Sequence, residues 1–272
     1  MKSVVTWTLL ASLAGAVAAA EAPAPTAHQI LERNLDALGG RAKFRAVHSL
    51  RLSATQSIPG APGKEVALRV LWKRPDRLRI EVPEEGLLHV QAFDGSVAWS
   101  SYPELPGFET EILEGEARDL LREQADLLEG PTFDPETKGH HVELVGREEL
   151  PGGPAWRILL TMASGELRTL WFDCETNLQV REERTARVGD REVVTVSILS
   201  DFRSVGGLLF AHRTESRQRE TGGPADGSGE PSIFAIQGLE LEVDLPDSLF
   251  APPASDPLPP PALAAPADLG LR

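Results

Sequence analysis

The sequence predicts a mainly β protein with few helices, in which the strands form one wide, curved antiparallel sheet. The first observation behind this fold class is a meander between residues 155 and 220. Segments rich in Val, Ile, Leu, Thr and aromatic residues alternate there with short breaks at Ser164-Gly165, Asn177, Gly189-Asp190 and Gly206-Gly207. Glycine and asparagine tolerate the positive φ angles of tight turns. Breaks this short cannot hold a crossover helix, so neighbouring strands must pair antiparallel.

The second observation is a similar series of strand-like segments nearer the N-terminus, at about 49–57, 65–73, 77–82, 87–93 and 97–101. Apolar and charged side chains alternate within it. One side carries Val66, Leu68, Val70, Trp72, Leu78, Ile80 and Val82, and the other carries Arg69, Lys73, Arg77, Arg79 and Glu81. One dry and one wet face are typical of an antiparallel sheet.

The third observation is that only two helices are indicated. Thr26 and Gln29 form a capping box at the start of the first, which runs from Thr26 to Leu38 and ends at Gly39-Gly40. Its apolar face is made by Ile30, Leu31, Leu35 and Leu38. The second is an amphipathic helix from Glu116 to Glu129 with Leu120, Leu121 and Leu128 on one stripe, stopped by Gly130-Pro131.

The remaining segments complete a domain over residues 26–250. Strands resume at His141–Glu149 after a loop, continue through the meander, and end with a strand near Ile233–Val243. Gly222–Pro231 is expected to be a flexible hairpin loop. The Pro- and Ala-rich tail, residues 251–272, is expected to be disordered.

Residues 1–20 have the pattern of a secretory signal. A positive residue, Lys2, precedes an apolar run from Val4 to Val17, and Ala18-Ala19-Ala20 offers a cleavage site. An uncleaved membrane anchor is the alternative, although the run is short and interrupted by polar residues. Residues 21–25 then form a linker. We expect an exported, soluble protein of the periplasm.

Composition narrows the possible partners. The chain has 272 residues and a formal net charge of −14, so its surface repels phosphate backbones and we expect no nucleic-acid partner. Its length fits one large β domain, and we expect a monomer. Cys174 is the only cysteine, which excludes an intrachain disulfide. Stability must therefore come from the packed core.

A sheet of about twelve strands must twist and curl, because open sheets of more than about ten strands are rarely flat. The two short helices are too small to cover its whole dry, concave side. Either the sheet closes on itself, or it keeps an apolar cavity under a helical lid.

In these features the chain resembles the LolA/LolB-like superfamily of periplasmic lipoprotein carriers and outer-membrane lipoprotein-sorting proteins. The resemblance covers roughly Thr26 to Pro253. It is carried by LDALGGRAKFRAVHSLRLSA, WKRPDRLRIE, FDGSVAW, LWFDCETNLQVRE, LSDFRSVGGLLFAHR and LEVDLPDSLFAPP, in that order. The family implies an incomplete antiparallel barrel of about eleven strands with a helical lid, whose concave face binds acyl chains. RseB-like periplasmic sensors share the fold, so the fold does not settle the function.

Residues on the dry side are candidates for the wall of an acyl-binding cavity, since lipid tails require predominantly apolar surroundings. The candidate cavity residues are Leu68, Val70, Trp72, Leu78, Ile80, Val90, Trp99, Leu160 and Trp171. The candidate lid residues are Ile30, Leu31, Leu35, Leu120 and Leu121. Ordinary core packing is the alternative for every tryptophan in this set.

Other residues give weaker signals. Arg69, Arg77 and Arg79 either bind an acidic headgroup or form the solvated face of two strands. His140 and His141 are adjacent on a strand and point to opposite faces, so we expect no metal site. Cys174 lies in an acidic turn, which favours a loop thiol over a nucleophile. No catalytic or cofactor-binding fingerprint is present, so we expect neither an enzyme nor a cofactor.

The sequence therefore favours a periplasmic carrier that holds lipid or lipoprotein acyl chains in a lidded apolar cavity. Two alternatives remain. One is an envelope sensor or assembly subunit that uses the same fold to bind a protein partner. The other is an enzyme of unrecognised type, such as an envelope hydrolase.

Overall fold

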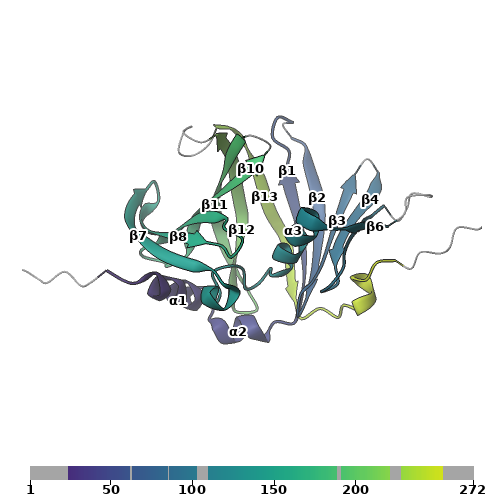
Figure 1. Cartoon of the computed structure of the whole chain (residues 1–272), viewed down its shortest axis with the longest axis horizontal. Coiled ribbons are helices and arrows are strands. Elements are labelled where there is room, and N and C mark those ends of the chain that lie inside the picture. Colours follow the sequence, from purple (N-terminus) through teal and green to yellow (C-terminus); the bar gives the residue numbers. More distant parts are fainter. Residues whose placement is uncertain are drawn as a thin grey trace, which may run out of the picture.

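The computed structural model describes residues 24–61, 63–84, 86–102, 110–188, 191–220 and 228–253. Within these residues the chain forms one sheet of thirteen strands in the order β6-β5-β4-β3-β2-β1-β13-β12-β11-β10-β9-β8-β7 (Figure 1). Every neighbouring pair is antiparallel. The terminal strands β6 and β7 are not paired with each other, so the sheet stays open.

The strands of the first half are β1 (Ser49–Ser57), β2 (Glu65–Lys73), β3 (Arg77–Glu84), β4 (Leu87–Phe93), β5 (Ala98–Ser101) and β6 (Glu111–Leu113). Those of the second half are β7 (His141–Leu150), β8 (Gly153–Thr161), β9 (Leu167–Asp173), β10 (Gln179–Val188), β11 (Arg191–Val205), β12 (Leu208–Glu220) and β13 (Ser228–Leu241). The helices are α1 (Ala27–Ala37), α2 (Arg41–Ala46) and α3 (Gly115–Ala125), with 3-10 turns η1 (Pro135–Lys138) and η2 (Asp247–Leu249).

The first and last strands, β1 and β13, join the two halves of the sheet. Their register places Leu50 opposite Leu241 and Leu52 opposite Leu239. Direct cross-strand apolar pairs of this kind stabilise a sheet. The β1 members are buried here, with Leu50 at 2 % exposure, and their β13 partners are half-buried. The centre of the sheet is therefore built from residues almost two hundred positions apart.

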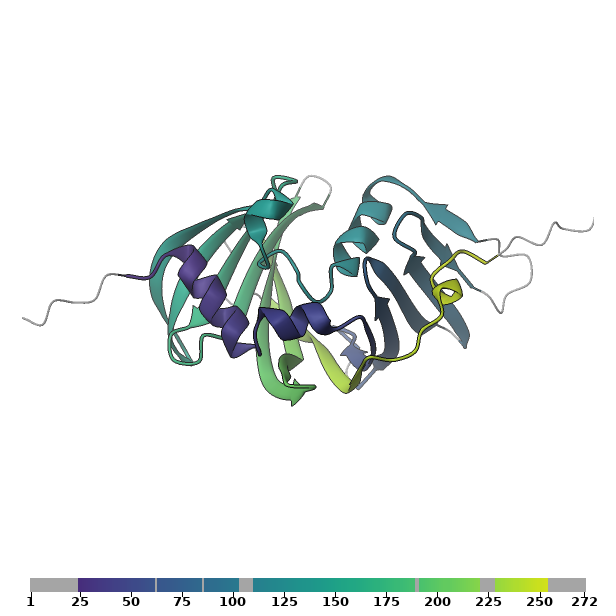
Figure 2. The same ribbon diagram turned by 90° about the horizontal axis from the view of Figure 1, so that it is seen from below.

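Helix α1 covers the concave side of the second half (Figure 2). The expected capping box is present: the Thr26 hydroxyl accepts from the Gln29 amide at 3.2 Å, and the Thr26 amide donates to Gln29 Oε1 at 2.9 Å. Ile30 and Leu31 then pack on the apolar face of β7, β8 and β9. This cluster also contains Val142, Ile158, Leu160, Leu170 and Phe172.

Helix α3 covers the concave side of the first half. Leu121 and Ala125 pack into a second cluster that contains Leu50, Leu52, Trp72, Leu78 and Phe93. The buried Trp72 indole Nε1 donates to the carbonyl oxygen of Ala125 at 2.6 Å. That carbonyl belongs to the last turn of α3, where no helical partner remains for it. Trp72 thus ties the end of the helix to strand β2.

The C-terminal segment, residues 243–250, crosses the opposite, convex face of the first half. Leu245 and Phe250 bury Leu71 of β2. The segment is held by backbone carbonyls: that of Leu245 accepts from Lys73 Nζ at 2.7 Å, and that of Phe250 accepts from Trp99 Nε1 at 2.7 Å. Both faces of this half-sheet are therefore covered.

Several sequence expectations are confirmed and some boundaries are corrected. The first helix and the strands before residue 101 lie close to where the alternation placed them. The described residues form thirteen strands rather than about twelve, because β6 lies in a stretch expected to be loop. Helix α3 ends at Ala125, before the expected Glu129, since Asp126 leaves the helical region at ψ 42°. Strand β13 begins at Ser228, inside the expected hairpin loop.

The expected signal at residues 1–20 and most of the tail lie outside the described residues, as does the part of the hairpin loop at 221–227. Linker residues 24 and 25 are described without regular structure. Within the described part of the chain, no helix is long and apolar enough to span a membrane.

The Trp72–Ala125 hydrogen bond gives a direct test of how α3 is anchored. Replacing Trp72 by Phe leaves the buried Ala125 carbonyl without a donor, which should lower the free energy of unfolding by about 1–3 kcal/mol. Urea denaturation measures this loss, and hydrogen exchange should localise it to α3. Trp156→Phe is the matched control, because no hydrogen bond of the Trp156 indole exists among the described residues. Equal losses in the two variants would contradict the anchoring role.

Candidate apolar binding site

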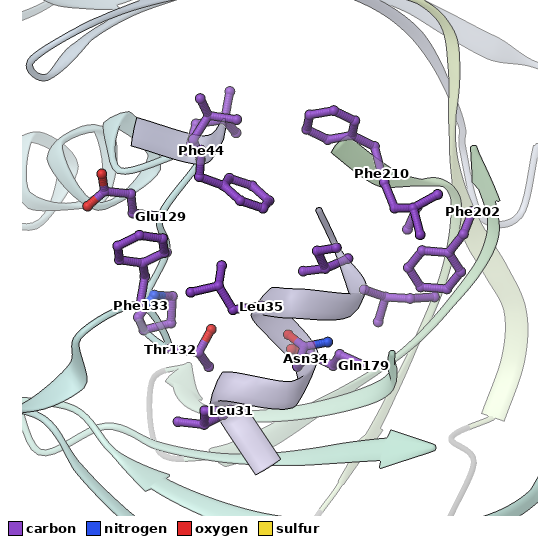
Figure 3. A pocket seen from close by; sticks show the side chains of 18 residues that line it. Leu31, Asn34, Leu35, Phe44, Glu129, Thr132, Phe133, Gln179, Phe202 and Phe210 are labelled. Carbon is purple, nitrogen blue, oxygen red and sulfur yellow. The ribbon is translucent and has the colours of Figure 1, made fainter. Parts of the chain in front are cut away.

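A cavity of about 320 Å³ opens on the concave side, between α1, α2, the segment 127–133 and strands β10 to β12 (Figure 3). Its wall is mainly apolar. The principal lining side chains are Leu31, Leu35, Phe44, Phe133, Phe202 and Phe210. Small-ligand pockets measure about 300–1,000 Å³ and are lined in this way, with few polar groups.

One wall of the cavity is held in place by aromatic and ionic contacts. The rings of Phe44 and Phe133 meet edge to face with centroids 6.4 Å apart. The Arg41 guanidinium lies 4.6 Å from the centre of the Phe133 ring, and its Nη1 lies 2.5 Å from Asp134 Oδ1. These contacts fix the segment that contains Phe133 against α2, although the segment has no regular structure of its own.

The other walls come from helix α1 and the sheet. Leu31 and Leu35 reach the cavity from α1, and Figure 3 shows Phe202 and Phe210 on the opposite side. The polar side chains at the edge are partly bonded within the protein. Asn34 Nδ2 donates to the carbonyl of Asn177 at 2.8 Å, and Glu129 Oε1 accepts from Arg74 Nη1 at 2.9 Å. The cavity therefore offers mostly hydrocarbon surface to a ligand.

A charged cluster links α3 to strands β9 and β10. Arg168 on β9 is only 8 % exposed; it contacts Glu123 of α3 and donates to Glu166 at 2.8 Å. Arg184 also bonds to Glu166, at 2.8 Å. Burial raises the pKa of the neighbouring Glu182 carboxyl, against the opposing effect of Arg168. Since α3 otherwise packs on β3, β4 and β5, this cluster bridges the two halves of the sheet.

The candidate cavity residues fall into two groups. Six lie on the concave side: Leu68, Val70, Trp72, Leu78, Ile80 and Leu160. They pack under α3 or α1, however, and none of them lines the 320 Å³ cavity. Their assignment to a ligand-binding wall stays a prediction that requires the helices to move.

Val90, Trp99 and Trp171 correct the prediction, because they lie on the convex face. In the ladder between β3 and β4, Val90 is opposite Glu81. Trp99 packs with Val90 in a cluster on the convex side. Trp171 stands between Arg157 and Arg181, and the Arg181 guanidinium lies 5.0 Å from its ring centre. The alternation of side chains predicted the strands that carry these residues, but it could not tell which face of the sheet is concave.

Four of the five candidate lid residues lie on the buried sides of α1 and α3. Ile30, Leu31, Leu35 and Leu121 are buried under the helices that carry them. Leu120 is the exception: it is 46 % exposed, and Leu121 occupies the core position of α3 instead. Movement of these helices as a lid stays a prediction.

Sequence reasoning missed the aromatic residues that line the cavity. Phe44, Phe133, Phe202 and Phe210 come from four separate segments. Phe133 carries the one usable signal: it is a large apolar residue in a Pro- and Gly-rich stretch that has no strand or helix period. Such a residue is expected to find a buried partner elsewhere in the fold.

The remaining candidates are engaged within the protein. Arg69 pairs with Glu81 at 3.1 Å, Arg77 with Asp247 at 3.3 Å, and Arg79 donates to the carbonyl of Leu249 at 2.9 Å. Burial raises the pKa of the Cys174 thiol, which lies in a turn. Among the described residues, no three His, Cys, Asp or Glu side chains gather closely enough to hold a metal ion.

Solved structures with similar folds identify the architecture. A LolA superfamily protein from Nitrosomonas europaea matches with a TM-score of 0.56 and 19 % identity, over 84 % of this chain and 98 % of that one. A DUF1329 family protein from Desulfovibrio piger matches with a TM-score of 0.56 and 13 % identity, over 83 % and 97 %. No family model and no curated protein matches the sequence. The predicted fold, a mainly β LolA-like architecture with an open sheet, is confirmed.

His140, beside the charged cluster, predicts a pH effect on stability. Its Nδ1 accepts a hydrogen bond from the Ala163 amide at 3.0 Å, which requires that nitrogen to be unprotonated. Burial lowers the pKa of His140, as do the charges of Lys138 and Arg168, while Asp126 and Glu123 act in the opposite direction. The folded state therefore binds fewer protons than the unfolded state, so stability rises with pH in this range.

Stability from this group should be complete above the unfolded pKa of about 6.5 and should be lost as the pH falls through the folded pKa. In His140→Gln, the decrease in unfolding free energy between about pH 7 and pH 5 should be smaller than in the wild type. His141→Gln is the control, since His141 is the next residue along the chain and is exposed at the start of β7. Urea titrations at each pH measure the slopes, and identical slopes for His140→Gln and wild type would refute the assignment.

Proposed function

We propose that this protein binds an apolar ligand, a lipid or lipoprotein acyl chain, in the concave cavity. The observation that carries the proposal is the cavity of about 320 Å³ lined by four phenylalanines and seven leucines under α1 and α2. The open LolA-like sheet supports it, because its concave face is apolar and, within the described residues, only α1, α2 and α3 lie on it (Figure 2). A wall that offers mostly hydrocarbon surface favours a binding role over a catalytic one.

The energetics of binding would be those of hydrocarbon burial. Each methylene moved from water into such a cavity is worth about 0.8 kcal/mol. The present volume accepts part of an acyl chain; a longer chain would require α1 or the segment 127–133 to move away from the sheet. Leu31, Leu35 and Phe133 would then exchange their present packing contacts for contacts with the ligand. Helices and ligand compete for the same surface, so release needs only a better acceptor.

The signal-like residues 1–20 support a location in the periplasm, where such a carrier would act between membranes. An envelope sensor with the same fold is the alternative. Protein purified from its native envelope should carry extractable lipid under our proposal. A stoichiometric protein partner without lipid would favour the sensor instead.

Filling the cavity provides the first direct test. Thr132 lines it from the segment 127–133, so Thr132→Trp should occupy ligand space. The uncharged fluorophore N-phenyl-1-naphthylamine should bind the wild type, and the variant should bind it at least about fivefold more weakly, a cost near 1 kcal/mol. Ala67→Trp, at an exposed position on β2, adds the same ring outside the cavity and should bind like the wild type. Undiminished binding by Thr132→Trp would refute the site.

The bridge between Glu123 and Arg168 predicts how fast the cavity opens. Glu123→Gln removes the charge that ties α3 to β9, so fluorophore uptake should accelerate about three- to tenfold in stopped-flow experiments, because the open state is less costly. Asp119→Asn is the matched control: Asp119 is on the same helix but pairs only with Arg118 and Arg122 within the described residues. If both variants take up the fluorophore at the wild-type rate, α3 does not gate the cavity.

A further inference from the structure

A second cleft, of about 370 Å³, lies on the convex face of the second half of the sheet. It is formed where the tip of the β7–β8 hairpin, residues 150–153, approaches strands β10, β11 and β12. Its apolar lining side chains are Leu150, Pro151, Ala155, Val180, Val196 and Ile198. Leu199 borders both this cleft and the concave cavity, so β11 separates the two.

Two arginines lie beside the apolar floor of this cleft. In the ladder between β10 and β11, Arg181 is directly opposite Ile198. In the ladder between β11 and β12, Arg217 is directly opposite Val196. Side chains paired in this way stand about 5 Å apart at their Cβ atoms. Arg181 and Arg217 therefore stand beside the two apolar residues from the strands on either side. The same ladders place Glu183 opposite Val196 and Glu215 opposite Ile198, and these two acids pair with Arg181 and Arg219 and with Arg213, respectively.

The guanidinium of Arg217 has no hydrogen-bond or ion-pair partner among the described residues. Glu183 accepts hydrogen bonds from both Arg181 and Arg219, each at 2.8 Å. Arg217 lines the cleft, yet it makes no hydrogen bond or ion pair with any residue that the structure describes. The Nε of Arg219, on the same strand, is buried and likewise has no acceptor among the described residues. This surface can therefore pair with an added anion, although the net charge of the chain is −14.

One acid also lines the cleft. Asp173 Oδ1 accepts from the amides of Glu175 and Thr176, at 3.1 and 2.6 Å, and from the Thr176 hydroxyl at 2.8 Å. Burial acts to raise the pKa of Asp173, but these hydrogen bonds hold it below the usual value. Its charge is engaged by its own turn, and the arginines outnumber it within the described lining.

We propose that the convex cleft binds an aliphatic monocarboxylate, with its carboxylate on the guanidinium of Arg217 and its chain on Val180, Val196 and Ile198. A guanidinium recognises a carboxylate with two parallel, charge-assisted hydrogen bonds. The apolar floor supplies the binding energy of the chain, and the volume suits a small ligand. This site is separate from the concave cavity and does not depend on its proposed role.

Decanoate is a suitable probe, and methyl NMR of the full chain can locate it. Titration should shift the methyl signals of Val196 and Ile198 in the wild type. The same shifts should persist in Thr132→Trp, where the concave cavity is filled. Arg217→Gln should bind decanoate about tenfold more weakly, which corresponds to 1.4 kcal/mol. Its unfolding midpoint should be unchanged, because Arg217 makes no contact of these kinds with the described residues.

Two controls separate charge from chain. Arg213→Gln changes the net charge equally on the same strand, but Arg213 pairs with Glu215 and does not line the cleft, so binding should stay at the wild-type level. Decanol has the same chain without the carboxylate and should bind wild type and Arg217→Gln equally. The proposal is overturned if decanoate shifts no methyl of Val196 or Ile198, if Thr132→Trp abolishes those shifts, or if Arg217→Gln binds as tightly as wild type.

Discussion

The pairing of β1 with β13 is the interaction on which the rest of the structure depends. It joins two meanders, β1 to β6 and β7 to β13, into one continuous sheet. The pairs Leu50–Leu241 and Leu52–Leu239 place apolar side chains on the concave face at that junction. Without it, each half would present a long unpaired edge, which is a known route to aggregation. The concave surface exists as one surface only because these distant strands meet.

The open edges β6 and β7 are consecutive in sequence but lie at opposite ends of the sheet. The connection between them, residues 114–140, carries α3 and crosses the concave side rather than closing a barrel (Figure 2). Trp72 anchors the end of α3 to one half, and Arg168 contacts it from the other. Barrel closure would require a short connection between β6 and β7. The connection here is instead long enough to cover part of the apolar face. The uncovered remainder is the cavity between Phe44, Phe133, Phe202 and Phe210.

Local patterns were sufficient to predict the strands other than β6, because alternation and short turns act over a few residues. They could not predict which face would be concave. Trp99 lies on the convex face, which residues 243–250, far along the chain, cover. Leu245 and Phe250 pack on that face against Leu71, and the Phe250 carbonyl accepts a hydrogen bond from the Trp99 indole. Apolar side chains therefore occur on both faces of the first half, and no rule of period two distinguishes them. Phe133 shows the same limit: its place in the cavity is set by Phe44 and Arg41, not by its neighbours in sequence.

The sheet is one layer thick, and strands β10 and β11 have a cavity on each face. Leu199 borders both, while Gln179 lines the concave cavity and Val180 the convex cleft. A register shift between Gln179 and Arg181 lies between the two sites, so the backbone there departs from a regular ladder. Ligands on the two faces would act on the same strands, and linkage requires any effect on affinity to be reciprocal. If an acyl chain in the concave cavity changes the affinity for decanoate by some factor, decanoate must change the affinity for that acyl chain by the same factor and in the same direction. An effect in one direction alone would mean that the two ligands were not measured at separate equilibrium sites.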